Sequence, residues 1–321
     1  MNITVIGCGR WGSLITWYLD HIGHRVTLYG RAASPRMQAF LTTRQNDLLT
    51  LPESVALSTA LDAALESAEA VIISIGSQSL RALLAEAPMQ ALRNKTVVLC
   101  MKGLEMGTGE RLSVIAGELL HPSCTVAVWL GPGHVQEFYR GIPNCMVIDS
   151  ENEQVKRRLV QAFSSDLIRF YYGGDMIGNE VGAAAKNVVG IAAGFLDGVE
   201  MSSLKGALMS RGTREVARLI RAMGGNELSA YGLCHLGDYE ATVFSPYSHN
   251  RQFGESFIRH QDYHRLAEGY YTVEALMVLS ERYQVELPIC RAVHAILYEN
   301  ADPREQLTEL LRRGLRAEFD D

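Results

Sequence analysis

Lys186 is the residue whose setting most strongly suggests chemistry. It lies in residues 182–194, a segment with the pattern of a helix that is apolar on nearly every side. Burial and a second lysine nearby would lower the pKa of Lys186 toward the range useful for proton transfer. Asp197 follows about three turns later on the same face, which favours a functional lysine over one that extends its ammonium to solvent at the helix edge.

Two loops are expected to bring further groups to the same place. Lys102 directly follows the strand predicted at 96–100, and Gly131 follows the strand predicted at 126–129. In an open α/β sheet, ligands bind beyond the carboxyl ends of the strands, so both loops should border a binding crevice. For Lys102 taken alone, a solvated loop position is the usual interpretation, and the residue by itself does not outweigh it.

A polar, turn-rich stretch at residues 237–251 provides the third group of candidates. Asp238 could hold a lysine ammonium, and a phosphate or carboxylate could be bound by Ser248, His249, Asn250 and Arg251. The alternative is a solvated loop with an Asx turn, and composition does not decide between the two.

A glycine-rich turn opens the chain directly after the strand predicted at 3–6. The pattern is G-x-G-x-x-G before a helix, and the candidate cofactor-binding residues in it are Gly7, Gly9, Arg10, Trp11 and Gly12. In this context the glycines permit a tight turn, close approach of a pyrophosphate and packing of helix on strand, while the helix N-terminus attracts phosphate. The sequence therefore predicts a dinucleotide site, with a ligand-free turn as the alternative.

The choice of cofactor should be visible after the second strand, predicted at 25–29. No acidic residue follows it until Asp47, whereas Arg31 stands where it could pair with a 2′-phosphate. We therefore expect NADPH to be used at least as well as NADH. The alternative is that Arg31 is a solvated loop residue, and a KM for NADH far below that for NADPH would contradict the prediction.

The elements that must position these residues divide the chain into two parts. Up to about residue 172, strands alternate with helical stretches; the other strands are expected at 71–75, 145–148 and 167–172. This alternation of strands and helices predicts an α/β fold, with an N-terminal Rossmann-type, doubly wound, mostly parallel sheet. Beyond it, helices are expected at 175–199, 203–223 and 272–285, with another beginning at Pro288. We place a dinucleotide-binding domain at 1–178 and an all-helical substrate domain at 179–321.

Composition excludes several classes of protein. The 321 residues suffice for two domains, and 47% hydrophobic with 21% charged residues excludes disorder, coiled coil and collagen. A net charge of −6 makes nucleic acid an unexpected partner. The six cysteines contain no C-x-x-C pair, which argues against a disulfide framework and a metal site. With neither a signal peptide nor a membrane-spanning stretch expected, the sequence indicates a cytoplasmic protein.

Taken in order, these motifs resemble the NAD(P)-dependent glycerol-3-phosphate dehydrogenases of the bacterial type. The resemblance covers almost the whole length and is carried by Gly7-x-Gly9-x-Trp11-Gly12, Lys102-Gly103-x-Glu105, Gly131-Pro132, Gly182-Ala183-x-x-Lys186-Asn187, Asp197-Gly198, Ser210-Arg211-Gly212, Gly237-Asp238, Thr242, Asn250-Arg251-x-x-Gly254 and Glu268-Gly269. It implies a Rossmann domain with a helical substrate domain, NADP or NAD as cofactor, and a homodimer. It also implies reduction of dihydroxyacetone phosphate to sn-glycerol 3-phosphate, the backbone precursor of phospholipids.

The resemblance also implies residue roles. Lys186 corresponds to the proton donor to the ketone oxygen and Lys102 to its neighbour at the substrate and cofactor. Asp238 and Thr242 correspond to residues that orient Lys186 and the substrate. Substrate contacts are implied for Gly131, Ser248, His249 and Asn250. Cofactor contacts are implied for Trp11, Arg31, Val135, Arg251, Leu266 and Glu268.

At two places the chain departs from the family pattern. Gly133-His134 replaces Ser-Phe after Gly-Pro, and His249 replaces an arginine that contacts the substrate phosphate. Either Arg251 and His134 compensate, or the substrate is another small phosphorylated or carboxylated carbonyl compound. If His249 binds the phosphate, activity should weaken as pH rises through its titration, and His249→Arg should raise affinity for dihydroxyacetone phosphate. A nucleotide-binding sensor without turnover is the remote alternative.

Overall fold

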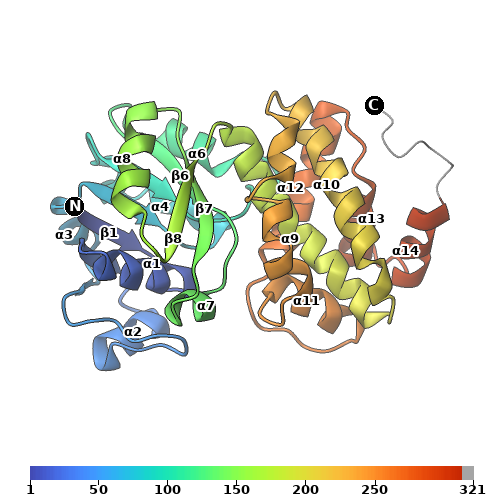
Figure 1. Cartoon of the computed structure of the whole chain (residues 1–321), viewed down its shortest axis with the longest axis horizontal. Coiled ribbons are helices and arrows are strands. Elements are labelled where there is room, and N and C mark those ends of the chain that lie inside the picture. Colours follow the sequence, from blue (N-terminus) through green and yellow to red (C-terminus); the bar gives the residue numbers. More distant parts are fainter. Residues whose placement is uncertain (313–321) are drawn as a thin grey trace.

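The structure, a computed structural model, describes residues 1–312 and is built on one eight-stranded sheet (Figure 1). The strand order is β3-β2-β1-β4-β5-β6-β7-β8, which places the first strand near the middle. The strands are β1 (Asn2–Ile6), β2 (Arg25–Tyr29), β3 (Ala56–Ser58), β4 (Ala70–Ile73), β5 (Thr96–Leu99), β6 (Thr125–Leu130), β7 (Asn144–Asp149) and β8 (Ile168–Tyr172). The first six strands are parallel, so their carboxyl ends lie along one edge.

The sheet confirms the predicted doubly wound, mostly parallel fold and adds two details. Strand β7 runs antiparallel to β6, and β8 runs parallel to β7. The short strand β3 pairs with β2 and was not predicted, because three residues are too few for an alternating pattern to stand out.

Helices cover both faces of the sheet. They are α1 (Arg10–His21), α2 (Pro35–Thr43), α3 (Leu61–Glu66), α4 (Leu80–Leu84), α5 (Ala87–Gln90), α6 (Leu112–Leu119), α7 (Val135–Tyr139) and α8 (Glu153–Phe163). Neighbouring residues of one strand pack on opposite sides: Ile72 joins one apolar cluster, and Val71 and Ile73 join the other. Because side chains alternate along a strand and both faces are buried, the strands are apolar throughout.

The second half of the described chain is helical, as expected. Its helices are α9 (Met176–Gly198), α10 (Lys205–Ala222), α11 (His249–Ile258), α12 (Glu268–Tyr283), α13 (Pro288–Tyr298) and α14 (Pro303–Arg312). Helix α9 passes from the sheet into the middle of the other helices and is buried along nearly its whole length (Figure 1). Residues 313–321 of the region assigned to the substrate domain lie outside the described residues. Within residues 1–312, no helix combines the length and apolar character needed to cross a membrane.

Glycines in α9 allow α11 to pack with backbone against backbone. A Cβ atom added to Gly194 would lie 2.1 Å from the Arg251 carbonyl oxygen and 2.9 Å from the Cα of Gly254.

We expect Gly194→Ala to destabilise the fold by about 1–3 kcal/mol, because the two backbones must separate. Urea unfolding measures the change, and Gly117→Ala in α6, where an added Cβ meets nothing within 4 Å, is the control. The free energy of unfolding of this control should rise by about 0.5–1 kcal/mol. Equal effects of both variants would contradict the packing argument.

Candidate active site

Two lysines share one buried carboxylate beyond the carboxyl ends of the strands. Lys102, three residues after β5, donates to Asp238 Oδ2 at 2.7 Å and to the Gly131 carbonyl oxygen at 2.6 Å. Lys186, in the middle of α9, lies 2.9 Å from the same Asp238 oxygen. Asp238 is only 1% exposed, so its charge is directed at the two ammonium groups. Residues predicted from three distant segments of the chain therefore meet at one point.

Thr242 completes this cluster of two lysines, Asp238 and Thr242, hereafter the lysine–aspartate cluster. The Lys186 ammonium donates to Thr242 Oγ1 at 2.8 Å, and the hydroxyl in turn donates to the backbone oxygen of Asp238 at 2.6 Å. Asp238 ends a 3₁₀ turn, and Thr242 lies in the π-helical turn Glu240–Phe244, a rare geometry that often occurs at functional sites. Lys186 is thus held inside the protein rather than extended to solvent.

The environment of Lys186 makes it a stronger acid than an ordinary lysine. Burial lowers its pKa to about 8; Lys102 acts in the same direction, and Asp238 opposes the shift. A group with this pKa is still protonated near neutral pH and releases its proton more readily than a free lysine.

Asp197 does not support Lys186, contrary to the prediction. Its Oδ2 accepts hydrogen bonds from Lys205 at 2.7 Å and Arg251 at 2.9 Å. Eleven residues place the two side chains on similar faces of α9, but α10 and α11 supply nearer partners for Asp197 at its end of the helix.

Asn187 is a site residue that the sequence interpretation did not single out. Its Nδ2 donates to the Lys102 backbone oxygen at 2.7 Å, and its Oδ1 accepts from Asn250 Nδ2 at 3.0 Å. Asn250 Oδ1 accepts from the Gly269 backbone N–H at 2.9 Å. This relay fixes the Lys102 loop against α9, α11 and α12. The signal in the sequence that could have identified Asn187 is an amide side chain directly after a lysine in a predicted buried helix.

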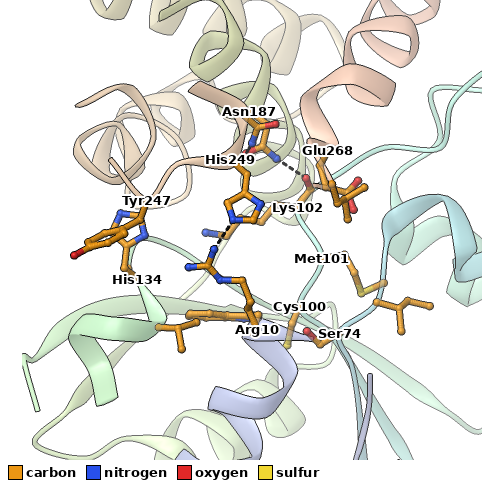
Figure 2. Close-up of a pocket in the computed structure, with 16 residues that line it drawn as sticks. Arg10, Ser74, Cys100, Met101, Lys102, His134, Asn187, Tyr247, His249 and Glu268 are labelled. Carbon is orange, nitrogen blue, oxygen red and sulfur yellow. Dashed lines mark hydrogen bonds between the residues drawn. The ribbon is translucent and has the colours of Figure 1, made fainter. Parts of the chain in front are cut away.

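A cavity of about 300 Å³ lies beside the lysine–aspartate cluster, between the sheet and the helices (Figure 2). Of the predicted site residues, those that line it are Arg10, Trp11, Lys102, Val135, His249, Asn250, Leu266 and Glu268. His134, considered above as a residue that could compensate at the phosphate, also lines the cavity. Further lining residues, not predicted as site residues, are Ser74, Ile75, Cys100, Met101, Gly133, Asn187 and Tyr247. Lys186 itself is not among the lining residues; its partner Lys102 is.

The glycine loop has the shape that a dinucleotide requires. Gly7 has φ +115°, and a Cβ there would lie 2.1 Å from the Ser74 carbonyl oxygen. A Cβ on Gly12 would lie 1.9 Å from the Gly7 oxygen, whereas one on Gly9 would meet only the Arg36 side chain, at 3.8 Å. No side chain caps the N-terminus of α1, so its free N–H groups and the open space at Gly9 fit a pyrophosphate.

Other groups at the cavity fit the rest of such a cofactor. The indole Nε1 of Trp11 and the Nε2 of His134 are buried without a hydrogen-bond partner in the described part of the chain. Glu268, at the start of α12, accepts from the Ser77 backbone N–H at 3.0 Å and from the Ser77 hydroxyl. Arg31 is exposed beyond the end of β2 and does not line the cavity.

Two residues of the polar stretch at 237–251 have structural partners. Ser248 caps α11, since its Oγ accepts from the Arg251 backbone N–H at 3.3 Å. The Arg251 guanidinium donates to Asp197 and Glu255, both at 2.9 Å, and Arg251 does not line the cavity. With these partners, Arg251 does not compensate for histidine at position 249.

His249 lies at the cavity, in surroundings that disfavour a charged imidazole. Burial lowers its pKa to about 4, and Arg10, Arg265 and Arg36 act in the same direction. A pKa this low places the titration of His249 below the mildly acidic range, so the predicted loss of activity with rising pH would fall there, and a pH profile of KM tests it. Burial also lowers the pKa of His134.

Comparison with known proteins adds sequence and structural relatives. Residues 2–156 match the family described as NAD-dependent glycerol-3-phosphate dehydrogenase N-terminus, and residues 175–308 match its C-terminus. A glycerol-3-phosphate dehydrogenase [NAD(P)+] from Streptomyces griseus is 36% identical, covering 99% of this chain and 98% of the relative. A glycerol-3-phosphate dehydrogenase [NAD(P)+] from Thiobacillus denitrificans is 35% identical, and the match covers 99% of this chain and 100% of the relative. The crystal structure of glycerol-3-phosphate dehydrogenase from Coxiella burnetii superimposes with a TM-score of 0.90 at 28% identity, covering 97% of this chain and 99% of that one.

Proposed function

Because this chain belongs to the NAD-dependent glycerol-3-phosphate dehydrogenase family, we propose that it reduces dihydroxyacetone phosphate reversibly to sn-glycerol 3-phosphate with NADPH or NADH. The observation that carries the proposal is the lysine–aspartate cluster beside a cavity at the carboxyl ends of the strands. The product is a building block for phospholipid synthesis.

The reaction needs one proton delivered to the ketone oxygen as the carbonyl carbon is reduced. A bound nicotinamide would supply the hydride. Lys186 donates the proton to the developing alkoxide, which its lowered pKa favours. Asp238 holds Lys186 and Lys102 in place, and Thr242 fixes the Lys186 ammonium. Lys102, on the cavity wall, adds positive charge where the oxyanion forms.

The glycine loop of Gly7, Gly9 and Gly12 would hold the cofactor, and Trp11, Val135, Leu266 and Glu268, which line the cavity, would contact it. Lys102 and Asn250 are within reach of the substrate, and Gly131 acts by orienting Lys102 through its carbonyl oxygen. Arg31, which is exposed after β2, would pair with the 2′-phosphate of NADPH.

The cofactor preference can be tested through Arg31. We expect Arg31→Ser to lower kcat/KM for NADPH by about 10–100-fold, because it removes a charge-assisted hydrogen bond worth about 1.5–3 kcal/mol. The kcat/KM for NADH should not change, since that cofactor has no 2′-phosphate. Arg25→Ser, at the opposite end of β2, removes the same charge as the control. A parallel loss with both cofactors would contradict the assignment.

The function itself is tested by following NADPH and then NADH absorbance with dihydroxyacetone phosphate and the purified protein. Rapid oxidation that depends on Lys186 supports the proposal. NADPH binding without turnover would transfer the proposal to another small carbonyl substrate, to be sought among phosphorylated and carboxylated ketones and aldehydes. Binding without turnover across that whole panel would favour a sensor.

The assembly, location and domain division are further proposals. We propose a homodimer, measurable by light scattering, and a cytoplasmic location, which the absence of disulfides among the six cysteines supports. Residues 1–178 would form the cofactor-binding domain and residues 179–321 the substrate domain, with the boundary in the first turn of α9, where the chain leaves the sheet.

A further inference from the structure

Arg10 and His249 meet across the cavity although they are 239 residues apart in the sequence. Arg10 is the first residue of α1, directly in the glycine loop, and His249 is the first residue of α11. Figure 2 shows the Arg10 side chain extending from α1 toward His249, with the hydrogen bond between Arg10 Nη1 and His249 Nε2 drawn as a dashed line. The contact joins the sheet half of the molecule to the helical half.

This hydrogen bond defines the state of the histidine. A guanidinium has five donors and no acceptor, so Nε2 of His249 must be the acceptor. The imidazole is then neutral, with its proton on Nδ1. The positive charge at this wall of the cavity therefore belongs to Arg10 and not to His249.

Arg10 also lacks an anionic partner. In the part of the chain that the structure describes, no carboxylate forms an ion pair with Arg10, although Asp47 acts on it from a distance. Arg265 lies near both Arg10 and His249, and Arg36 lies near His249. A half-buried guanidinium among other arginines, bound only to a neutral imidazole, leaves an electropositive wall on a cavity of about 300 Å³. Such a wall is suited to a phosphate dianion.

We propose that Arg10, which the glycine-loop pattern placed among the cofactor contacts, instead binds the phosphate of the substrate and supplies from α1 the guanidinium that position 249 lacks. The inference rests on the proposed function. Arg251 is unsuited to this role because Asp197 and Glu255 already occupy its guanidinium. Asn250 lines the cavity beside His249, which places an amide next to the same phosphate. Substrate binding would then use residues of both halves of the protein, and the phosphate would replace His249 as the partner of Arg10.

The first test is Arg10→Ser, assayed against substrate and cofactor separately. We expect the KM for dihydroxyacetone phosphate to rise by about 10–100-fold, the loss typical of one charge-assisted contact. The Kd of NADPH, measured by its fluorescence, and the kcat/KM for unphosphorylated dihydroxyacetone should not change. Arg25→Ser removes one arginine at the opposite edge of the sheet and should leave all three values unchanged.

The second test introduces a guanidinium at position 249 in place of the one removed at position 10. In Arg10→Ser, the added change His249→Arg should restore most of the affinity for dihydroxyacetone phosphate. In the wild-type background, His249→Arg should bring no gain, because two guanidinium groups would then face each other.

The remaining outcomes separate this inference from the function on which it rests. A wild-type enzyme that turns over dihydroxyacetone phosphate, with an unchanged KM in Arg10→Ser, would overturn the role of Arg10 alone. Weaker NADPH binding with an unchanged KM for the substrate would assign Arg10 to a cofactor phosphate instead. A wild-type protein without any turnover of dihydroxyacetone phosphate would overturn both proposals.

Discussion

Replacing Lys186 with alanine is expected to lower kcat for dihydroxyacetone phosphate reduction by about 10²–10⁴-fold, the usual contribution of a positioned general acid. The fold should tolerate the change, because Asp238 keeps Lys102 as its partner at 2.7 Å. The KM for NADPH should change little, since the partners of the Lys186 ammonium are Asp238 and Thr242 and not residues of the glycine loop. Steady-state kinetics together with a thermal melt measure all three quantities.

The pH profile provides an independent measure of the same residue. Reduction requires protonated Lys186, whose pKa is lowered to about 8 by burial. The kcat for reduction should therefore be constant at lower pH and decrease as pH rises through about 8. Oxidation of glycerol 3-phosphate requires the unprotonated amine and should increase through the same range. The residual activity of Lys186→Ala should lack this titration.

Two further variants identify which ammonium donates the proton. Lys95→Ala, on the loop before β5 at the opposite end of the strand, is the control and should leave kcat unchanged. Lys102→Ala should raise the KM for the substrate, because Lys102 lines the cavity. If Lys102→Ala abolished the pH dependence and Lys186→Ala did not, proton donation would belong to Lys102.

Asp238→Asn is expected to destabilise the protein by about 3–5 kcal/mol, because it leaves two ammonium groups without their counter-charge. The asparagine is nearly isosteric, so the loss arises from the charge and not from a cavity. Activity should decrease as well, since Lys186 and Lys102 lose the group that positions them. Urea unfolding gives the stability change, and steady-state kinetics gives the activity.

The control is Asp166→Asn, in the exposed turn before β8, which should remain within about 0.5 kcal/mol of the wild type. Adding Lys102→Met to Asp238→Asn removes one uncompensated cation and should recover part of the lost stability. Strictly additive losses in the double variant would show that Asp238 does not act through its charge on Lys102.

Much of the sheet half was predictable because its signals are local. The apolar strands, the glycine turn after β1 and the position of Lys102 after β5 all depend on patterns only a few residues long. The buried helix around Lys186 was equally clear from its composition. The reversed direction of β7 was not, since an apolar run is the same in either direction.

The partners of the polar residues required the tertiary structure. Helical periodicity placed Asp197 on the Lys186 face, yet Lys205 and Arg251 reach it first because α10 and α11 pack there. Similarly, Arg251 was predicted at the cofactor, but it does not line the cavity, whereas His249, two residues earlier on α11, does. Two positions along a helix turn a side chain by about 200°, to nearly the opposite face.

The sequence by itself therefore determined the sheet half and the helical half, the glycine turn after β1 and the candidate residues that meet at the lysine–aspartate cluster. The packing of α9 and α11 against the sheet determined which charges face each other: Asp238 against both lysines, and Arg10 against His249. The physical reason is that the two kinds of feature depend on different neighbours. Strand and helix formation depends on neighbours along the chain, whereas a pKa and an ion pair depend on groups within a few ångströms, wherever they lie in the sequence.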